Sequence, residues 1–305
     1  MTDDFESISP VLSTLSALSN DLAALVQGAS GYTVRVEDGS RLSGTGVIWS
    51  AAGIVVTTSH GLERDEDLTI ELADGTAHKA ILIGRDPESD IAVLKTDVEG
   101  LAAAPKALPE AVKVGSLVVA VGRPGKLGLQ ATLGLINSRY EVETNGKAEY
   151  ILNTDAVLYP GFSGGPLVGA DGNIVGIVNR WFGRGSAVAL GVPVVDEVVA
   201  SLEGYGRIRR GYLGIRTQVA PLPEALRATL EREQSHGLLI VQVEPGSPAD
   251  IAGLLLGDAI VGIDSTPLID VDSLRAHLLA GKTITIHTLR GGERRDFEVT
   301  IAVQR

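Results

Sequence analysis

The segment "GFSGGP", residues 161–166, places three glycines around one serine, Ser163. A serine hydroxyl can attack an acyl group, and the negative charge that develops on the carbonyl oxygen is stabilised by backbone N–H groups that point at it. Gly161 allows the chain to turn its N–H inward, and the N–H of Ser163 supplies a second donor. Gly164 and Gly165 leave space for a substrate. The string therefore predicts a nucleophile beside an oxyanion hole; the alternative is a glycine-rich turn with an incidental serine.

A serine nucleophile needs a general base and a carboxylate that orients this base. Of the five histidines, His60 ends the apolar segment "GIVVTTSH", where a strand gives way to a loop, and the others lie in polar or strand-surface contexts. The segment "RDPESDIAVLK" offers Asp86, Glu88 and Asp90, and Asp90 directly precedes an apolar run that would draw it inward. The sequence thus predicts His60, Asp90 and Ser163 as a triad, in the chain order of chymotrypsin-like proteins.

Short β-strands are expected to carry these residues. From residue 31 to about residue 203, segments rich in β-branched residues alternate with Gly and Asp, six before the Pro/Ala-rich stretch 102–111 and six after it. Two packed six-stranded barrels account for this pattern. His60 and Asp90 then belong to the first barrel and Ser163 to the second, so that the predicted site lies in a cleft between them.

Two helices are expected at the borders of the barrels. One covers residues 9–27, where five leucines at helical spacing form an apolar stripe: Leu12, Leu15, Leu18, Leu22 and Leu25. The stripe packs against the chain's own body or forms an interface with another subunit. The second helix is expected over 194–206, with Gly204 near its C-terminal end. The chain beyond it mixes strands and helices, which indicates a separate α+β domain.

Composition excludes several kinds of site. The chain of 305 residues has no cysteine, which removes disulfides, thiolate metal sites and a cysteine nucleophile together. The net charge of −12 argues against nucleic acid as a partner. No cluster of His, Asp or Glu has metal-ligand spacing, and neither a metal nor a cofactor is expected. The start "MTDDFESISP" is acidic, unlike a secretory leader, and no apolar run suits a membrane span, so a cytoplasmic protein is expected.

Nearly everything after residue 31 resembles the HtrA/Deg family of trypsin-like serine proteases with a C-terminal PDZ domain. The matching segments are 44–60, 84–95, 151–168 and 211–264. The resemblance implies a mainly β fold, in which a chymotrypsin-like double six-stranded β-barrel at 31–206 is followed by an α+β PDZ domain at 207–305. An N-terminal helical segment, 1–30, precedes them.

The same resemblance implies an ATP-independent serine endopeptidase that cleaves unfolded or damaged polypeptides. His60, Asp90 and Ser163 match the triad of the family, and Gly161 and Ser163 match its oxyanion hole. Polypeptides and peptide C-termini are the implied partners, and a homotrimer is the implied assembly. The competing hypothesis is a non-catalytic, chaperone-like peptide-binding protein in which the triad persists beside a collapsed oxyanion hole.

The resemblance also locates two binding regions. The segment "SAVALGVP" (186–193) borders the S1 pocket of the family, and its small neutral side chains predict cleavage after small or medium aliphatic residues: Ala187, Val188 and Ala189. The segment "YLGI" resembles the loop that binds a peptide carboxylate, while the peptide adds a strand to the sheet edge; it comprises Tyr212, Leu213, Gly214 and Ile215. A closed groove with a structural role is the alternative for this region.

Some positions depart from the family pattern. Phe162 stands where the family usually has Asn, and Gly61–Leu62 stands where Val-Val usually follows the histidine. A bulky side chain at position 162 favours whichever state of the oxyanion loop buries it, and we expect burial against the second barrel in the open state. Trp181 and Phe182 either form a wall of the substrate cleft or pack at a loop end.

Overall fold

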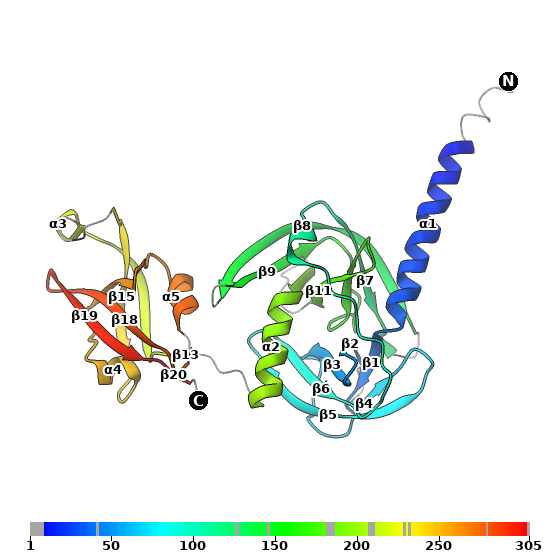
Figure 1. Ribbon diagram of the computed structural model, residues 1–305, viewed down its shortest axis with the longest axis horizontal. Coiled ribbons are helices and arrows are strands. Elements are labelled where there is room, and N and C mark those ends of the chain that lie inside the picture. The colour runs from blue at the N-terminus through cyan, green and yellow to red at the C-terminus, as the bar shows by residue number, and fades with distance from the viewer. Residues whose placement is uncertain are drawn as a thin grey trace. The chain divides into compact units, whose positions relative to one another are not determined.

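A computed structural model of the chain describes residues 9–40, 43–125, 128–144, 147–180, 187–206, 211–227, 230, 233–278 and 280–303. Trp181 and Phe182, expected either in a wall of the substrate cleft or at a loop end, lie outside the described residues. The chain divides into two compact units, Met1–Val142 with Ala148–Ile208 and Glu143–Lys147 with Arg209–Arg305. Figure 1 shows the helices and strands of both units.

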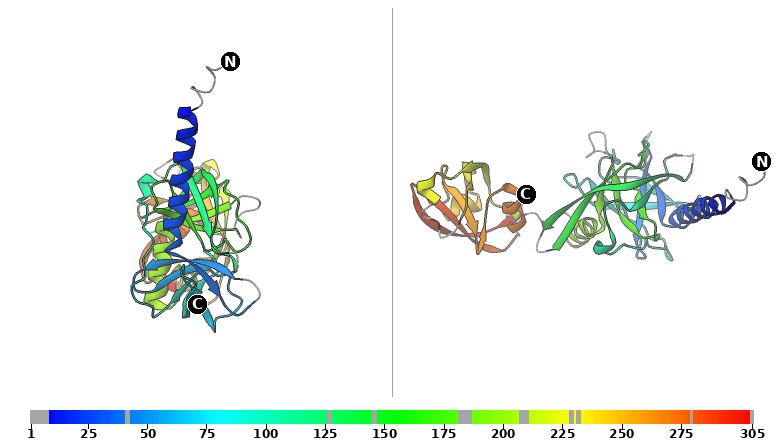
Figure 2. Two further views of the ribbon diagram at one scale, coloured as in Figure 1. Left: turned by 90° about the vertical axis from the view of Figure 1, so that its right-hand side faces the viewer. Right: turned by 90° about the horizontal axis from the view of Figure 1, so that it is seen from above.

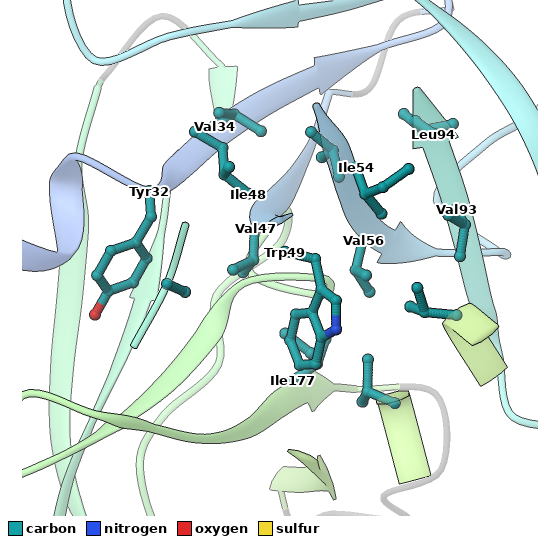
Figure 3. Packing of buried hydrophobic residues seen from close by; sticks show 14 of the residues in the cluster. Tyr32, Val34, Val47, Ile48, Trp49, Ile54, Val56, Val93, Leu94 and Ile177 are labelled. Carbon is teal, nitrogen blue, oxygen red and sulfur yellow. The ribbon is translucent and has the colours of Figure 1, made fainter. Parts of the chain in front are cut away.

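The first barrel closes in the order β1-β2-β3-β6-β5-β4, and all of its strand pairs are antiparallel. Its strands are β1 (Thr33–Glu37), β2 (Gly44–Ser50), β3 (Ile54–Thr58), β4 (Leu68–Glu71), β5 (Ala77–Asp86) and β6 (Ile91–Lys95). Closure leaves no free sheet edge and points aliphatic side chains inward. Figure 3 shows Val34, Ile48, Val56 and Leu94 packed together in this core.

The second barrel closes in the order β10-β11-β12-β9-β8-β7. Its strands are β7 (Leu117–Gly122), β8 (Gln130–Thr144), β9 (Lys147–Thr154), β10 (Pro166–Gly169), β11 (Ile174–Asn179) and β12 (Ala187–Gly191). The short 3-10 helix η1 (Pro109–Ala111) lies in the Pro/Ala-rich joint before β7. The predicted pair of six-stranded barrels is therefore confirmed.

Helix α1 (Ser9–Ser30) projects from the barrels, as Figures 1 and 2 show. Near its C-terminal end, Leu22 and Leu25 pack against the core of the first barrel. Further toward the N-terminus, Leu15 and Leu18 are 56% and 46% exposed. The leucine stripe thus covers the barrel at one end only, and its other end faces solvent.

The C-terminal end of α1 is held by a buried cation from the second barrel. The Arg123 guanidinium donates to the Ser30 hydroxyl at 2.8 Å, to the Ser30 carbonyl at 3.4 Å and to the Thr33 carbonyl at 3.0 Å. Burial lowers the pKa of Arg123. A positive charge suits the negative end of the helix dipole, so the contact stabilises the helix where it joins the barrel.

Helix α2 (Val192–Tyr205) follows β12 and buries five apolar side chains: Val192, Val195, Val198, Val199 and Leu202. It ends at Gly206, which has φ of +66° and donates its N–H to the Leu202 carbonyl at 2.8 Å. The helix therefore runs past Gly204, and the left-handed cap falls on the next glycine. Asp196 of α2 accepts a hydrogen bond from the Trp49 indole at 2.8 Å, which ties the helix to β2.

The second unit is an α+β domain around a sheet of order β14-β15-β16-β18-β19, with β17 paired to β16 and β13 paired to β20. Its strands are β13 (Gly211–Tyr212), β14 (Ile215–Pro221), β15 (His236–Val243), β16 (Ala259–Ile263), β17 (Thr266–Pro267), β18 (Thr283–Arg290), β19 (Glu293–Thr300) and β20 (Ala302–Val303), and its helices are α3 (Glu224–Arg227), α4 (Pro248–Ala252) and α5 (Val271–His277). A separate aliphatic core stabilises this unit.

Candidate active site

His60 and Asp90 are adjacent because the strands that carry them pair. The antiparallel register of β3 and β6 places Thr58 opposite Ile91, so the residues just past these two ends meet. Asp90 Oδ2 binds His60 Nδ1, and Asp90 Oδ1 accepts the His60 backbone N–H at 2.7 Å. A carboxylate only accepts, so the hydrogen of the neutral ring lies on Nδ1, and Nε2 is the ring nitrogen that carries the lone pair.

Asp90 is almost fully enclosed, with 3% of its surface exposed. Its backbone lies in the left-handed region with φ of +56°, a conformation that Asp tolerates better than most residues. Asn179 Nδ2, at the end of β11, donates to Asp90 Oδ2 at 2.8 Å. Nothing in the sequence marked Asn179 as a partner. The second barrel thus supplies a donor to the carboxylate of the first.

The turn that carries His60 is tied to β5. The Arg85 guanidinium donates to the carbonyl of Ser59 at 3.4 Å and to the carbonyl of Leu62 at 3.2 Å. These two carbonyls flank His60 in the chain. The contacts restrict the turn on both sides of the ring, and this helps to keep the ring at Asp90.

Asp38 restricts the same turn at its far end. Its carboxylate accepts the N–H groups of Ser40 at 2.9 Å, Glu63 at 2.6 Å and Arg64 at 3.1 Å. Burial alone would raise the pKa of Asp38, but these hydrogen bonds outweigh it and hold the pKa below its usual value. The chain just after His60 is thereby fixed by a buried, ionised acid.

The segment before Ser163 forms a tight turn. The Phe162 N–H donates to the Tyr159 carbonyl at 3.0 Å, with Pro160 and Gly161 between them. Gly161 has φ of +86°, which together with a preceding Pro defines a type II turn. The two central residues of the turn are Pro160 and Gly161, and the peptide unit between them carries the Gly161 N–H. In a type II turn this unit points the opposite way from its direction in a type I turn. A Cβ at position 161 would lie 2.5 Å from Pro124 Cβ. The turn therefore needs glycine both for its positive φ and for lack of space.

Two backbone donors of this loop remain available. The Phe162 carbonyl accepts the Gly165 N–H at 2.8 Å, and because the peptide bond is trans, the Ser163 N–H points the opposite way. Within the described part of the chain, the N–H groups of Gly161 and Ser163 make no hydrogen bond. Both donors are therefore free to bind an anionic oxygen.

The Ser163 hydroxyl is held separately from the imidazole. Its Oγ accepts the backbone N–H of Arg180 at 3.3 Å, and among the residues the structure describes this is its only hydrogen bond. The described contacts therefore join His60 to Asp90 directly, and they link Ser163 to the pair through two consecutive residues, Arg180 and Asn179.

Phe162 is completely buried in the core of the second barrel. Its ring meets Tyr159 edge to face, with 5.8 Å between ring centroids. A Cβ on Gly122 would lie 2.6 Å from the ring, so the ring fills the space that this glycine leaves. The side chain that departs from the family pattern thus anchors the loop rather than occupying its solvent side.

The residues expected at the S1 pocket differ in accessibility. Ala187, at the start of β12, is partly exposed, whereas Val188 and Ala189 are buried and Ala189 belongs to the second-barrel core. Only Ala187 of the three presents surface to a ligand. The register of β11 and β12 places Val188 opposite Asn179.

In the second unit, the four residues of the expected carboxylate loop connect β13 to β14. Leu213 is buried, and Gly214 has φ of +80° with its carbonyl accepting the Glu244 N–H at 2.9 Å. The Tyr212 hydroxyl hydrogen-bonds the Glu244 carboxylate, which raises the pKa of Tyr212. Ile215 starts β14, whose partner is β15.

The described residues contain neither a metal-ligand cluster nor a membrane-spanning helix. They hold no group of three or more His, Asp or Glu side chains arranged for a metal ion. No helix among them has the length and apolar character needed to cross a bilayer.

Comparison with known families identifies both units. The family described as trypsin-like peptidase domain matches residues 44–177, and the family described as PDZ domain matches residues 211–301. A probable periplasmic serine endoprotease DegP-like of Halomonas elongata is 31% identical over 290 residues, which are 92% of this chain and 60% of the relative. Its counterpart in Pseudomonas putida is 31% identical over 85% of this chain and 55% of the relative. The chain thus spans between half and two thirds of the length of these relatives.

Solved structures of similar proteins extend over both units. The HtrA-type protease AlgW with a decapeptide gives a TM-score of 0.79 at 27% identity, covering 93% of this chain and 98% of that one. The serine endoprotease from Yersinia pestis gives a TM-score of 0.76 at 29% identity, and the match covers 92% of this chain and 97% of that one.

The names of the relatives correct one expectation. They are periplasmic proteins by name, so the cytoplasmic location expected from the sequence is wrong. That expectation rested on the acidic first ten residues and on the lack of an apolar run that suits a membrane span, and neither feature identifies the compartment in which the folded units work.

Proposed function

Because the chain belongs to the HtrA-type, DegP-like serine proteases, we propose that it is a periplasmic, ATP-independent serine endopeptidase acting on unfolded or damaged polypeptides. Ser163 is the nucleophile, His60 the general base and Asp90 the residue that orients His60. The N–H groups of Gly161 and Ser163 form the oxyanion hole. The observation that carries the proposal is the type II turn at Gly161, with φ of +86°, which leaves both donors without a partner among the described residues.

The proposed reaction proceeds through an acyl-enzyme. Ser163 Oγ attacks the scissile carbonyl while its proton passes to His60 Nε2, and Asp90 stabilises the imidazolium that results. The carbonyl oxygen becomes an oxyanion that the two backbone N–H groups bind. His60 then gives the proton to the leaving amine as the C–N bond breaks. Water, deprotonated by His60, attacks the acyl-enzyme and releases the carboxylic acid and the Ser163 hydroxyl.

Specificity at the cleavage site is proposed to follow from the small residues at the start of β12. Ala187 presents a methyl group rather than a charge to the pocket, which suits a small or medium aliphatic side chain of the substrate. The loop formed by Tyr212, Leu213, Gly214 and Ile215 is proposed to bind peptide C-termini, with the peptide adding to the sheet at β14. The AlgW relative was solved with a decapeptide, which supports peptides as ligands.

A non-catalytic peptide-binding protein is the competing function, and one observation favours it. Among the described residues, no hydrogen bond joins His60 to Ser163. Catalytic hydrogen bonds are often long before substrate binds, whereas a collapsed hole would need Gly161 to leave its positive φ. The turn geometry therefore supports the enzyme.

The test is labelling of the full chain with a fluorophosphonate, followed by mapping of the modified residue and a casein cleavage assay. Ser163→Ala should lose the label and slow cleavage by at least about 1,000-fold, because the mutation removes the nucleophile but leaves the loop backbone unchanged. Ser265→Ala, at an exposed serine of the second unit, is the matched control and should keep both the fluorophosphonate label and the rate of casein cleavage. Undiminished cleavage by Ser163→Ala would reject the assignment, and an unlabelled wild-type protein would favour the binding function.

A further inference from the structure

Thr45, on β2 of the first barrel, contacts the nucleophile loop (residues 159–165) with three of its groups. Its Oγ1 donates to the Gly161 carbonyl at 2.6 Å, and its N–H donates to the Ser163 carbonyl at 3.4 Å. Its carbonyl oxygen lies so close to Gly164 that a Cβ there would collide with it. Thr45 is fully buried, so water does not compete for these contacts.

The direction of the Thr45 hydroxyl hydrogen follows from its two partners. Oγ1 accepts the backbone N–H of Arg123 at 2.9 Å and bonds the Gly161 carbonyl at 2.6 Å. An amide N–H can only donate and a carbonyl can only accept, so the single hydroxyl hydrogen points at Gly161. The orientation of the hydroxyl hydrogen is therefore fixed, and loss of the hydroxyl removes the partner of the buried Arg123 N–H and of the partly buried Gly161 carbonyl.

This donor fixes the peptide unit between Gly161 and Phe162. The carbonyl of the unit is held by Thr45, and its N–H is held by the Tyr159 carbonyl at 3.0 Å. The two proposed oxyanion donors, the N–H groups of Gly161 and Ser163, lie in the peptide units immediately before and after it. The orientation of the clamped unit consequently sets the spacing of both donors.

We propose that Thr45 is a positioning residue of the oxyanion hole, through which the first barrel fixes the nucleophile loop of the second. The inference rests on the proposed function, since it assigns Thr45 a role in that reaction. Thr45 touches no reacting atom and acts through Gly161. Because oxyanion donors stabilise charge that is present only in the transition state, loosening them lowers kcat and leaves KM nearly unchanged.

Three variants of the full chain test the role. Thr45→Val keeps the shape but removes the hydroxyl, Thr45→Ser keeps the hydroxyl, and Thr33→Val is the matched control. Thr33 is also fully buried in the first barrel, and its hydroxyl donates to the Ala29 carbonyl at 2.7 Å, away from the loop. Steady-state cleavage of a peptide substrate gives kcat and KM, and thermal unfolding gives the folded fraction.

We expect Thr45→Val to lower kcat by about 10- to 100-fold with KM within about twofold, since removal of a whole oxyanion donor costs about 100- to 1,000-fold. Thr45→Ser should stay within about threefold of the wild type. Thr33→Val should lose stability without a comparable loss of kcat. Equal kcat in Thr45→Val and Thr33→Val, or a loss explained by the unfolded fraction, would overturn the inference.

Hydrogen exchange measured by mass spectrometry separates this inference from the proposed function. Amides in 159–165 should exchange faster in Thr45→Val than in the wild type and in Thr33→Val, because the clamp on the loop is lost. Unchanged exchange would overturn the positioning role even if the wild type is an active protease. A wild type inert to fluorophosphonate would reject the proposed function, and the exchange comparison would still decide whether Thr45 orders the loop.

Discussion

Replacement of Phe162 by asparagine separates the stability of the second barrel from the chemistry of its loop. Asn is the residue that the resemblance to the HtrA/Deg family places here, yet the Phe162 ring is fully buried in the second-barrel core and packs on Gly122 and Tyr159. The substitution therefore exchanges a core side chain for a smaller, polar one. It changes no backbone group that holds the loop.

The expected loss of stability follows from the buried area. An aromatic side chain buries about 150–250 Å², which at about 25 cal/mol per Å² corresponds to about 4–6 kcal/mol. Gly122 has no side chain to fill the vacated space, so a cavity persists. The amide of the asparagine is also left in an apolar core. We expect Phe162→Asn to lower the free energy of unfolding by at least about 3 kcal/mol.

The reactivity of the folded variant should change much less. The Phe162 N–H bonds the Tyr159 carbonyl at 3.0 Å and its carbonyl accepts the Gly165 N–H at 2.8 Å, and neither contact uses the ring. The turn that exposes the Gly161 N–H therefore survives while the barrel is folded. Fluorophosphonate labelling per folded molecule should stay within about tenfold, an activation-energy change of about 1.4 kcal/mol.

Denaturant unfolding followed by circular dichroism measures the first effect, and labelling kinetics scaled by the folded fraction measure the second. Phe162→Leu is the matched control, because it keeps an apolar side chain and should lose less stability than Phe162→Asn. A stability of Phe162→Asn within about 1 kcal/mol of the wild type would refute the core role of the ring. An inert wild type with a strongly reactive Asn variant would instead show that the native hole is collapsed, and the binding function would prevail.

Two further predictions concern the His60 turn and the projecting helix. Asp38→Asn should lower the free energy of unfolding at pH 7 by about 1–3 kcal/mol, because an amide is a poorer acceptor for the Glu63 and Arg64 N–H groups. Since folding lowers the pKa of Asp38, its stabilisation is present above the unfolded pKa of about 3.9 and is lost as pH falls through the folded pKa; wild type and variant should converge in acid denaturation, and a gap independent of pH would contradict this. If the exposed Leu15 and Leu18 form a subunit interface, deletion of residues 1–28 should lower the mass measured by light scattering by more than the deleted residues account for; a mass lowered only by those residues would exclude the stripe as an interface.

The sequence was sufficient to nominate the residues that have local signatures. His60 and Asp90 border apolar strands, and Ser163 lies in a glycine-rich segment. Each of them can therefore be recognised from the residues next to it in the sequence. The double barrel was predicted from the spacing of short apolar segments. Strand β8 (Gln130–Thr144), however, continues well beyond the segment "LQATLGLI" from which it was predicted. Polar residues extend that strand by pairing, which apolar periodicity does not report.

Partners distant in the chain left no such signature. Asn179 lies 89 residues from Asp90, and Thr45 lies 116 residues from Gly161. Their hydrogen bonds exist only because the two barrels meet, so a local pattern of residue types does not predict them. The end of α2 has a local signature, because the helix expected over 194–206 ends at Tyr205 with its left-handed cap on Gly206.

The division of the proposed site between the barrels also bears on the order in which its residues come together. During synthesis, His60, Asp90 and Thr45 leave the ribosome long before the chain that carries Ser163 and Asn179. Until β11 docks, Asp90 has no Asn179 donor and Thr45 has no Gly161 carbonyl to hold. A nascent chain in which only the first barrel has folded lacks the proposed nucleophile Ser163 and is therefore expected to be inert. Partly folded copies, which expose unfolded segments of the kind that the protein is proposed to cut, are then not expected to cleave one another.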